Sequence, residues 1–228
     1  EMNIRDWSSD VCSSDLTELS KLLELCHKHG VKHIIMAGRI PHKVLLKQIS
    51  FDPRVLKILG SLSSKKADSL LLAATKEIEK EGITVLNSTM FLKTCLPKPG
   101  LLTPGCPADE ETMKNFEFGY PIAKGIARLD VGQTITVKNQ IVVAVEGIEG
   151  TDSLISRSGE LAEEGIVVVK VSKPKQDMRF DVPVIGKRTF ENLVKVKARA
   201  LCVTANQTIF MDQDESLALA EKNGITVY

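Results

Sequence analysis

The chain has 228 residues, of which 43% are hydrophobic, with 30 basic and 29 acidic side chains. This length accommodates one large domain or two small ones, and the apolar content favours a packed core over a disordered chain. A formal net charge of +1 argues against a protein that binds nucleic acid through bulk positive charge. No apolar run in the sequence approaches the roughly 20 residues that a transmembrane helix needs.

The first sixteen residues do not have the pattern of a folded domain. Asp6–Leu16 shows no helical or strand period, and it back-translates to a common short-read sequencing adapter. We therefore expect residues 1–16 to be a cloning or assembly artefact and leave them out of the fold prediction. A natural serine-rich leader is the alternative. The segment holds one basic and four acidic residues, so the rest of the chain carries a formal charge of +4.

The cysteines of the remaining chain are scattered. They are Cys26, Cys95, Cys106 and Cys202, and none forms a C-x-x-C pair. The spacing predicts neither a zinc site nor a disulfide framework, so a reducing cytoplasm is the expected compartment.

Residues 17–96 alternate between helical and strand patterns, which predicts a Rossmann-like α/β domain. A buried strand over 31–37 ends at Gly38 and Arg39, which are candidate substrate contacts, with an ordinary turn as the alternative. The expected helices span 19–29, 44–48, 55–62 and 68–81, and a second strand spans 83–86.

The composition shifts at residues 97–107, which hold four prolines and two glycines. This pattern predicts a linker or an ordered crossover. Residues 108–228 then predict a second, catalytic α/β domain with a mixed or parallel sheet. Its expected helices span 108–129, a segment ending near 162, 189–197 and 214–222, and its strands span 133–137, 141–145, 166–171, 200–203 and 225–228.

A dense run of charge follows the buried strand 166–171. It contains Lys170, Lys173, Lys175, Gln176, Asp177, Arg179 and Asp181. Cations and carboxylates at the carboxyl end of a strand suit a site that binds phosphate together with a divalent metal. Asp177 and Asp181 are the candidate Mg²⁺ ligands, while Lys173 and Arg179 are placed to neutralise phosphate charge. A solvated loop with internal ion pairs is the alternative.

A second candidate site lies at Glu149–Asp152, where a strand meets a helix. Gly150 permits a close backbone approach, and the free N–H groups at a helix N-terminus bind anions. In the functional interpretation, Gly150 and Thr151 bind phosphate or ribose and the two carboxylates lie near the metal. In the alternative, Thr151 or Asp152 only caps the helix.

Four segments of the chain together resemble a known family. They are Met36–Arg39, Leu129–Gln133, Ala144–Asp152 and Val169–Gly186, of which the last two are long and specific. Over essentially all of residues 17–228 the chain is similar to the UDP-2,3-diacylglucosamine pyrophosphatases of lipid A biosynthesis, of the LpxI type.

The resemblance implies a two-domain hydrolase with its substrate between the domains. Such enzymes use Mg²⁺ to direct water at the α-phosphorus of UDP-2,3-diacylglucosamine, releasing 2,3-diacylglucosamine 1-phosphate (lipid X) and UMP. The essential aspartate of the family maps to Asp177 or Asp181. We favour Asp177 as the catalytic or metal-organising carboxylate, with Asp181 beside it and Lys173 assisting.

The complete expected site divides into a substrate set and a metal set. The substrate-binding residues are Lys170, Gln176, Arg179, Gly150, Thr151, Gly38, Arg39 and Gln133. The ligands of Mg²⁺, with Mn²⁺ as the second choice of ion, are Asp177, Asp181, Glu149 and Asp152. The expected partners are a lipid-bearing UDP-sugar, the cytoplasmic face of the inner membrane in transient contact, and a second copy of the chain in a homodimer. The competing functions are a metal-independent nucleotide-sugar-binding protein and a structural α/β module.

The chain departs from the family at its beginning. Family members start with a strand and a glycine-rich turn, whereas this chain starts with the adapter-like segment. We therefore expect an N-terminally truncated first domain with exposed sheet edges, and an aggregation-prone or inactive protein.

Overall fold

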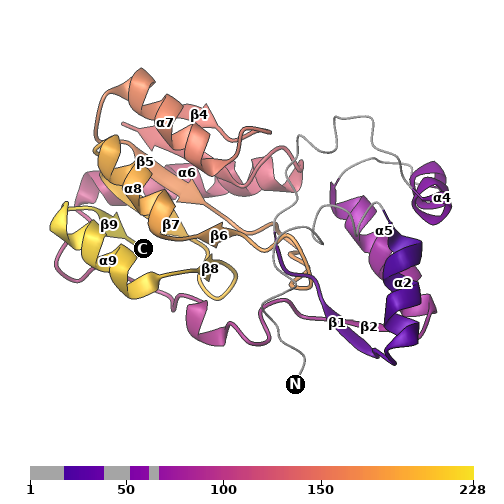
Figure 1. Ribbon diagram of the computed structural model, residues 1–228. Helices are drawn as coiled ribbons and strands as arrows, with labels where there is room; N and C mark the ends of the chain where they lie inside the picture. The colour runs from indigo at the N-terminus through magenta and orange to yellow at the C-terminus, as the bar shows by residue number, and fades with distance from the viewer. Residues whose placement is uncertain (1–17, 39–51, 62–66) are drawn as a thin grey trace. The chain divides into compact units, whose positions relative to one another are not determined.

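The computed structural model describes residues 18–38, 52–61 and 67–228 (Figure 1). The expected helix 44–48 and Arg39 lie outside the described residues. The chain divides into two compact units, residues 1–90 and 91–228, and each contains helices and strands. The predicted α/β class is therefore confirmed. In the part that the structure describes, no helix is both long and apolar enough to cross a bilayer.

The first unit is built on a two-stranded parallel sheet. β1 (His33–Ile35) pairs with β2 (Thr84–Leu86), and helices α2 (Leu19–Lys28), α4 (Pro53–Ser61) and α5 (Ala67–Lys80) pack with it. The apolar stripe of α2 supplies Leu19, Leu23 and Cys26 to the core, as its period predicts. Gly30, with a φ of 63°, follows the end of this helix in the left-handed conformation that glycine adopts readily.

The second unit contains a five-stranded mixed sheet with the order β4-β3-β5-β7-β9. The strands β5, β7 and β9 are parallel, whereas β3 is antiparallel to both of its neighbours. The elements are α6 (Glu110–Arg128), β3 (Thr134–Lys138), β4 (Ile141–Val145), α7 (Thr151–Ala162), β5 (Val167–Lys170), α8 (Lys187–Lys195), β7 (Ala200–Val203), α9 (Gln213–Lys222) and β9 (Thr226–Val227).

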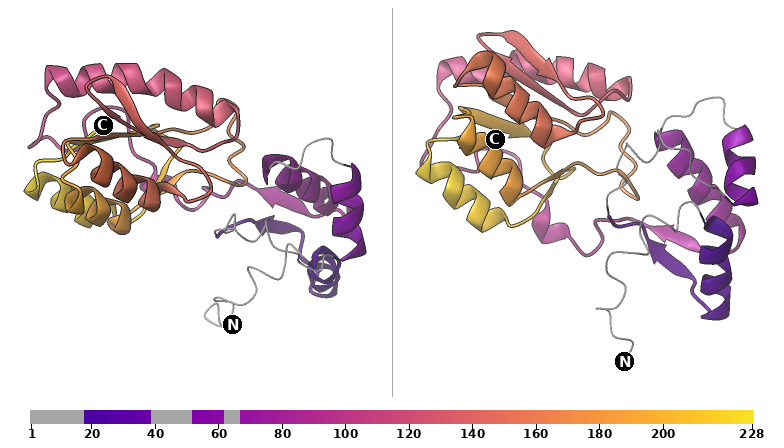
Figure 2. Two further views of the ribbon diagram at one scale, coloured as in Figure 1. Left: turned by 90° about the horizontal axis from the view of Figure 1, so that it is seen from above. Right: turned by 45° about the horizontal axis from the view of Figure 1, so that its top comes forward.

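Helices cover both faces of this sheet. Figure 2 shows α6 on one face and α7, α8 and α9 on the other. Val167 and Val169 of β5 pack in the cluster that contains α6, whereas Val168 packs in the cluster of the opposite face. Because successive side chains of a strand point to opposite faces, a strand covered on both sides is apolar throughout, which explains the continuous valine run.

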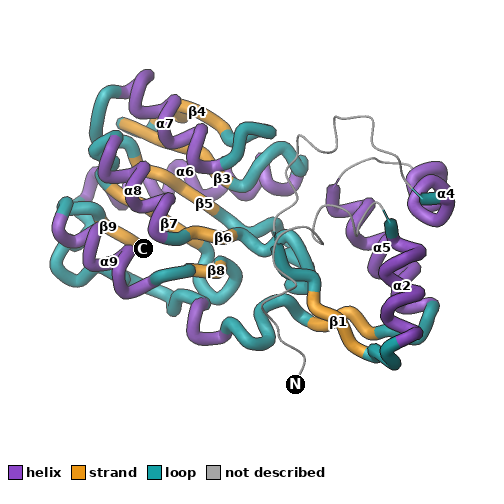
Figure 3. The backbone as a smooth tube through the Cα atoms, viewed as in Figure 1, coloured by secondary structure: helices purple, strands orange, loops and turns teal. Residues whose placement is uncertain are grey.

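Two short strands were not predicted from the sequence. β6 (Val184–Ile185) pairs in parallel with β8 (Ile209–Phe210), apart from the main sheet (Figure 3). Two residues are too few to show a strand period, so the pairing depends on packing. The ring of Phe210 stacks on Phe190 of α8 with ring centroids 5.3 Å apart. A 3-10 helix, η2 (Lys93–Cys95), precedes the proline-rich segment.

The proline-rich segment 97–107 is ordered against the second unit. Leu102 N donates to Val227 O at 2.8 Å, and Val227 N donates to Thr103 Oγ1 at 2.8 Å. Asn206 N also donates to Pro97 O at 2.9 Å. Of the two expectations, a linker or an ordered crossover, the contacts describe an ordered segment that extends the edge of the sheet beside β9.

Two glycines of α6 predict opposite effects of the same substitution. A Cβ on Gly119 would lie 3.0 Å from Cγ2 of both Val137 and Val169, which are fully buried, whereas a Cβ on Gly125 would meet nothing within 4 Å. We expect Gly119→Ala to lower the free energy of unfolding by about 1–3 kcal/mol through overpacking. Gly125→Ala should raise it by about 0.5–1 kcal/mol. Urea unfolding of both variants measures the difference, and equal effects would contradict the packing of α6 on the sheet.

Candidate functional site

One edge of the main sheet collects most of the predicted site residues. Thr134 lies opposite Lys170 in the antiparallel pairing of β3 with β5, so Gln133 lies at the carboxyl end of β5. β4 runs antiparallel to β3 with Val145 opposite Ile135, so the chain after β4 returns to the same edge. The carboxyl edge of parallel strands is where α/β proteins commonly bind ligands.

A buried charged network lies at this edge. Lys170 and Glu146 are 6% and 8% exposed. Lys170 Nζ donates to Thr151 Oγ1 at 2.7 Å, and Thr151 Oγ1 donates to Glu146 Oε1 at 2.7 Å. The other carboxylate oxygen, Glu146 Oε2, accepts from Gln133 N at 3.0 Å. The network therefore fastens the end of β5, the start of α7 and the start of β3 to one another.

The pKa of Glu146 lies below its ordinary value. Burial raises this pKa, but the positive charge of Lys170 and hydrogen bonds from Thr151, Thr134 and Gln133 N outweigh the effect of burial. Glu146 is therefore ionised at neutral pH, and Lys170 faces a carboxylate inside the protein. Both side chains are engaged in hydrogen bonds within this network. The substrate-binding roles of Lys170 and Thr151 stay predictions.

Gly150 occupies the N-cap position of α7 with a φ of 80°, and no side chain caps the helix. The expected alternative, in which Thr151 or Asp152 is only a helix cap, is not what the structure shows. Thr151 belongs to the buried network, and Asp152 Oδ2 lies 3.0 Å from Arg188 Nε. Because no side chain caps α7, the N–H groups of its first turn carry the partial positive charge that attracts an anion.

Gln176 organises the loop that follows β5. Its Oε1 accepts from Lys173 N at 3.2 Å, and its Nε2 donates to the carbonyl oxygens of Asp177, Phe180 and Asp181 at 3.3, 3.2 and 3.1 Å. The amide thus holds the loop closed on itself. Its expected contact with substrate stays a prediction, whereas its contacts with the loop backbone are direct.

Asp177 and Asp181 face different cations. Both oxygens of Asp177 accept from Arg179, whose Nε and Nη2 lie 3.0 and 2.8 Å away, and these hydrogen bonds hold the pKa of Asp177 below its ordinary value. Asp181 Oδ2 instead lies 2.7 Å from Lys173 Nζ and accepts from Gln133 Nε2 at 3.4 Å. The alternative of internal ion pairs in the loop thus describes these contacts.

The four expected metal ligands do not converge. Glu149 Oε1 lies 2.7 Å from Arg157 Nη2, so each of the four carboxylates pairs with a cation of its own. Within residues 18–38, 52–61 and 67–228, no three His, Cys, Asp or Glu side chains are grouped to hold a metal ion.

A smaller set of oxygen donors fits a cation at this edge. Mg²⁺ is usually held by one or two carboxylates, with water and substrate phosphate oxygens completing its shell. Asp181 is 34% exposed by its side chain and is accessible for such a role. Beside it, Gln133 Oε1 is buried without a hydrogen-bond partner in the described structure. An orphaned amide oxygen next to a carboxylate is a donor pair of the kind that a hard cation uses.

Sequence reasoning missed two carboxylates of the site. Glu146 directly follows the strand β4, and Asp130 Oδ1 lies 2.7 Å from Lys173 Nζ. Both residues stand within the segments that carry the family resemblance, which was the only available signal. Gly38 belongs to the first unit, where it is exposed with a φ of 126°, and Arg39 lies outside the described residues.

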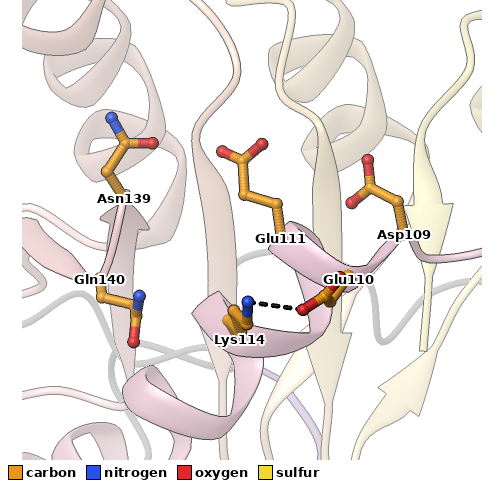
Figure 4. A pocket seen from close by; sticks show the side chains of 6 residues that line it. All are labelled: Asp109, Glu110, Glu111, Lys114, Asn139 and Gln140. Atoms are coloured by element: carbon orange, nitrogen blue, oxygen red, sulfur yellow. Dashed lines mark ion pairs between the residues drawn. The ribbon is translucent and has the colours of Figure 1, made fainter.

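A separate hollow of the second unit is too acidic to bind phosphate. It lies where the start of α6 meets the turn between β3 and β4 (Figure 4). Figure 4 shows Lys114 paired with Glu110, at an N–O distance of 2.6 Å. The lining residues are Asp109, Glu110, Glu111, Lys114, Asn139 and Gln140. Its three carboxylates outnumber the cations that pair with them, Lys114 and Arg199, so the β5 edge is the stronger candidate for a phosphate-binding site.

The acid at the start of α6 predicts a pH-dependent contribution to stability. Asp109 caps α6, and hydrogen bonds from Thr112, together with Arg199, lower its pKa to about 2. Because this pKa is lower than in the unfolded chain, the contribution is complete above about pH 4 and is lost as the pH falls through about 2. Asp109→Asn keeps a capping side chain but removes the charge. Thermal melts should show a gap between wild type and variant that narrows below about pH 4; a gap independent of pH would contradict this account.

The buried network predicts a large effect of removing one charge. Glu146→Gln leaves Lys170 buried opposite a neutral amide, so we expect the free energy of unfolding to fall by about 3 kcal/mol. Glu164→Gln is the matched control, because Glu164 forms an exposed pair with Lys197 at 3.0 Å. That control should change the free energy by at most about 1 kcal/mol. Urea unfolding measures both variants, and comparable small losses would show that the network is not essential for stability.

Two family models match this chain. The LpxI N-terminal domain matches residues 3–95, and the LpxI C-terminal domain matches residues 98–228. The N-terminal match runs across the segment attributed to a sequencing adapter, and that attribution stays a prediction. The Caulobacter vibrioides protein named UDP-2,3-diacylglucosamine pyrophosphatase LpxI is 29% identical over 221 residues, covering 92% of this chain and 78% of the relative. Because the C-terminal model alone spans more than half of the chain, the protein belongs to the LpxI family.

Proposed function

We propose that this protein hydrolyses UDP-2,3-diacylglucosamine to 2,3-diacylglucosamine 1-phosphate and UMP, as a step of lipid A biosynthesis. The observation that carries the proposal is the Lys173–Asp181 pair beside the orphaned Gln133 oxygen, at the ligand-binding edge of a sheet. The family match and the printed name of the Caulobacter relative support the substrate.

The proposed chemistry is attack of water on the α-phosphorus. A new bond forms between the water oxygen and the α-phosphorus, and the bond to the bridging oxygen breaks. The bridging oxygen leaves with 2,3-diacylglucosamine 1-phosphate, and the water oxygen stays in UMP. Lys173 and Arg179 neutralise charge on the phosphate oxygens as the bond breaks, and Asp181 orients the attacking water and accepts its proton. Mg²⁺, when bound, would add charge neutralisation and would be held by Asp181 and Gln133 Oε1.

Asp181 takes the role for which the sequence favoured Asp177. Both oxygens of Asp177 are occupied by the guanidinium of Arg179, two residues away. In this proposal Asp177 holds Arg179 in position, while Asp181, which pairs with Lys173, meets the substrate.

The lipid part of the substrate implies contact with a membrane surface. We propose that the protein works at the cytoplasmic face of the inner membrane. Exposed apolar side chains in the loops of the same edge, Leu129, Val131 and Ile148, support this location.

Hydrolysis in ¹⁸O-labelled water tests the reaction and the point of attack together. With Mg²⁺ present, mass spectrometry should find one labelled oxygen in UMP and none in 2,3-diacylglucosamine 1-phosphate. Chelation of the metal by EDTA should stop the reaction. Label in the lipid product would place the attack on the β-phosphorus. Calorimetric binding of the UDP-sugar without turnover would favour the non-catalytic binding protein.

Two single variants test the assignment of the aspartates. Asp181→Asn should lower kcat by about 100-fold or more, because a positioned acid–base group contributes at least this much. Asp177→Asn keeps the shape of the side chain and should have a clearly smaller effect. If Asp177→Asn is as damaging as Asp181→Asn, or more so, the roles are reversed.

A further inference from the structure

Asp130 occupies a backbone position that normally belongs to glycine. α6 ends at its C-cap Leu129, and Asp130 follows with a φ of 60°; its N–H donates to Ala127 O at 3.1 Å. A left-handed residue directly after a helix is usually glycine, because a Cβ is crowded in that conformation. Aspartate is one of the few other residues that adopt this conformation, because its short side chain can make polar contacts nearby.

The side chain of Asp130 is directed to the cation of the candidate site. Lys173 Nζ lies 2.7 Å from Asp130 Oδ1 and 2.7 Å from Asp181 Oδ2. The side chains of Lys173 and Asp130 are 11% and 16% exposed, so water screens this pair less than a surface pair. Asp130 and Asp181 come from separate loops, and both have a left-handed backbone.

The geometry points to Asp130 as a positioning residue that holds the Lys173 ammonium where it meets a substrate phosphate. Lysine has a long, flexible stem, and one carboxylate leaves it free to swing about that contact. Asp130, which comes from a different loop than Asp181, supplies a second carboxylate that fixes the ammonium in place before the substrate binds. Fixed charge of this kind needs little reorganisation during the reaction. The inference rests on the proposed function for its substrate, but its contacts involve this chain alone.

A double-mutant cycle tests whether Asp130 acts through Lys173. Asp130→Asn keeps the shape and tolerates the left-handed backbone, and it should lower kcat by about 100-fold and also weaken binding of the diphosphate. In a Lys173→Met background, the same substitution should have almost no further effect. Additive losses in kcat would overturn the inference. Glu164→Gln, which removes a surface ion pair before the amino end of β5, is the control and should leave kcat unchanged.

A stability measurement separates positioning from a structural role. Asp130→Gly relieves the left-handed strain, so its melting temperature should equal or exceed that of the wild type while kcat falls as in Asp130→Asn. A lower melting temperature with full kcat would show that Asp130 is structural and would overturn the inference.

The same cycle can be measured without turnover. Calorimetry gives the dissociation constant of UDP for wild type, the two single variants and the double variant. Non-additive losses of affinity support the inference even if the UDP-sugar is not hydrolysed, which would count against the proposed function alone. Additive losses of affinity would overturn the inference while leaving hydrolysis open to its own test.

Discussion

The antiparallel register between β3 and β5 is the constraint on which the candidate site depends. It sets Thr134 opposite Lys170 and so brings Gln133 to the carboxyl end of β5. Lys170 shares the strand face of Val168, opposite to the face of Val169, and there it meets Thr151 at the start of α7. Because side chains alternate along a strand, a slip of one residue would turn Lys170 toward α6 and separate it from Thr151.

The buried charges of Lys170 and Glu146 also make this register specific. Neutral side chains of the same shape would hold the strands together at lower desolvation cost, so the buried charges of Lys170 and Glu146, bridged by the Thr151 hydroxyl, are not explained by stability alone. It does specify one arrangement, since any other register leaves a charge buried without its counterpart. The loops that leave this edge of the sheet therefore begin at fixed positions. Lys173 lies only three residues beyond Lys170, so the position of its backbone is fixed as well.

The sequence predicted the elements whose patterns are local. The valine run of β5 and the apolar stripe of α2 are both set by neighbouring residues. β6 and β8 were not predicted, because their pairing joins residues that are far apart in the chain. The charged loop was found by its composition, but its ion-pair partners were not. Spacing suggested that Asp177 and Asp181 meet, whereas Asp130, which shares a cation with Asp181, lies at the end of a distant helix.

The proline-rich segment 97–107 belongs to the folded second unit, because it hydrogen-bonds to β9. Its Thr103 hydroxyl accepts from Val227 N, and the carbonyl oxygen of Cys106 accepts from Thr226 Oγ1 at 2.9 Å. β9 is the last strand of the sheet, so these residues cover an edge that would otherwise expose unpaired backbone groups. A fragment that starts at Ala108 would lose this cover, and its exposed edge strand β9 could then pair with strands of other copies. The sequence between Pro97 and Pro107 is thus better regarded as the protecting border of the sheet than as a tether.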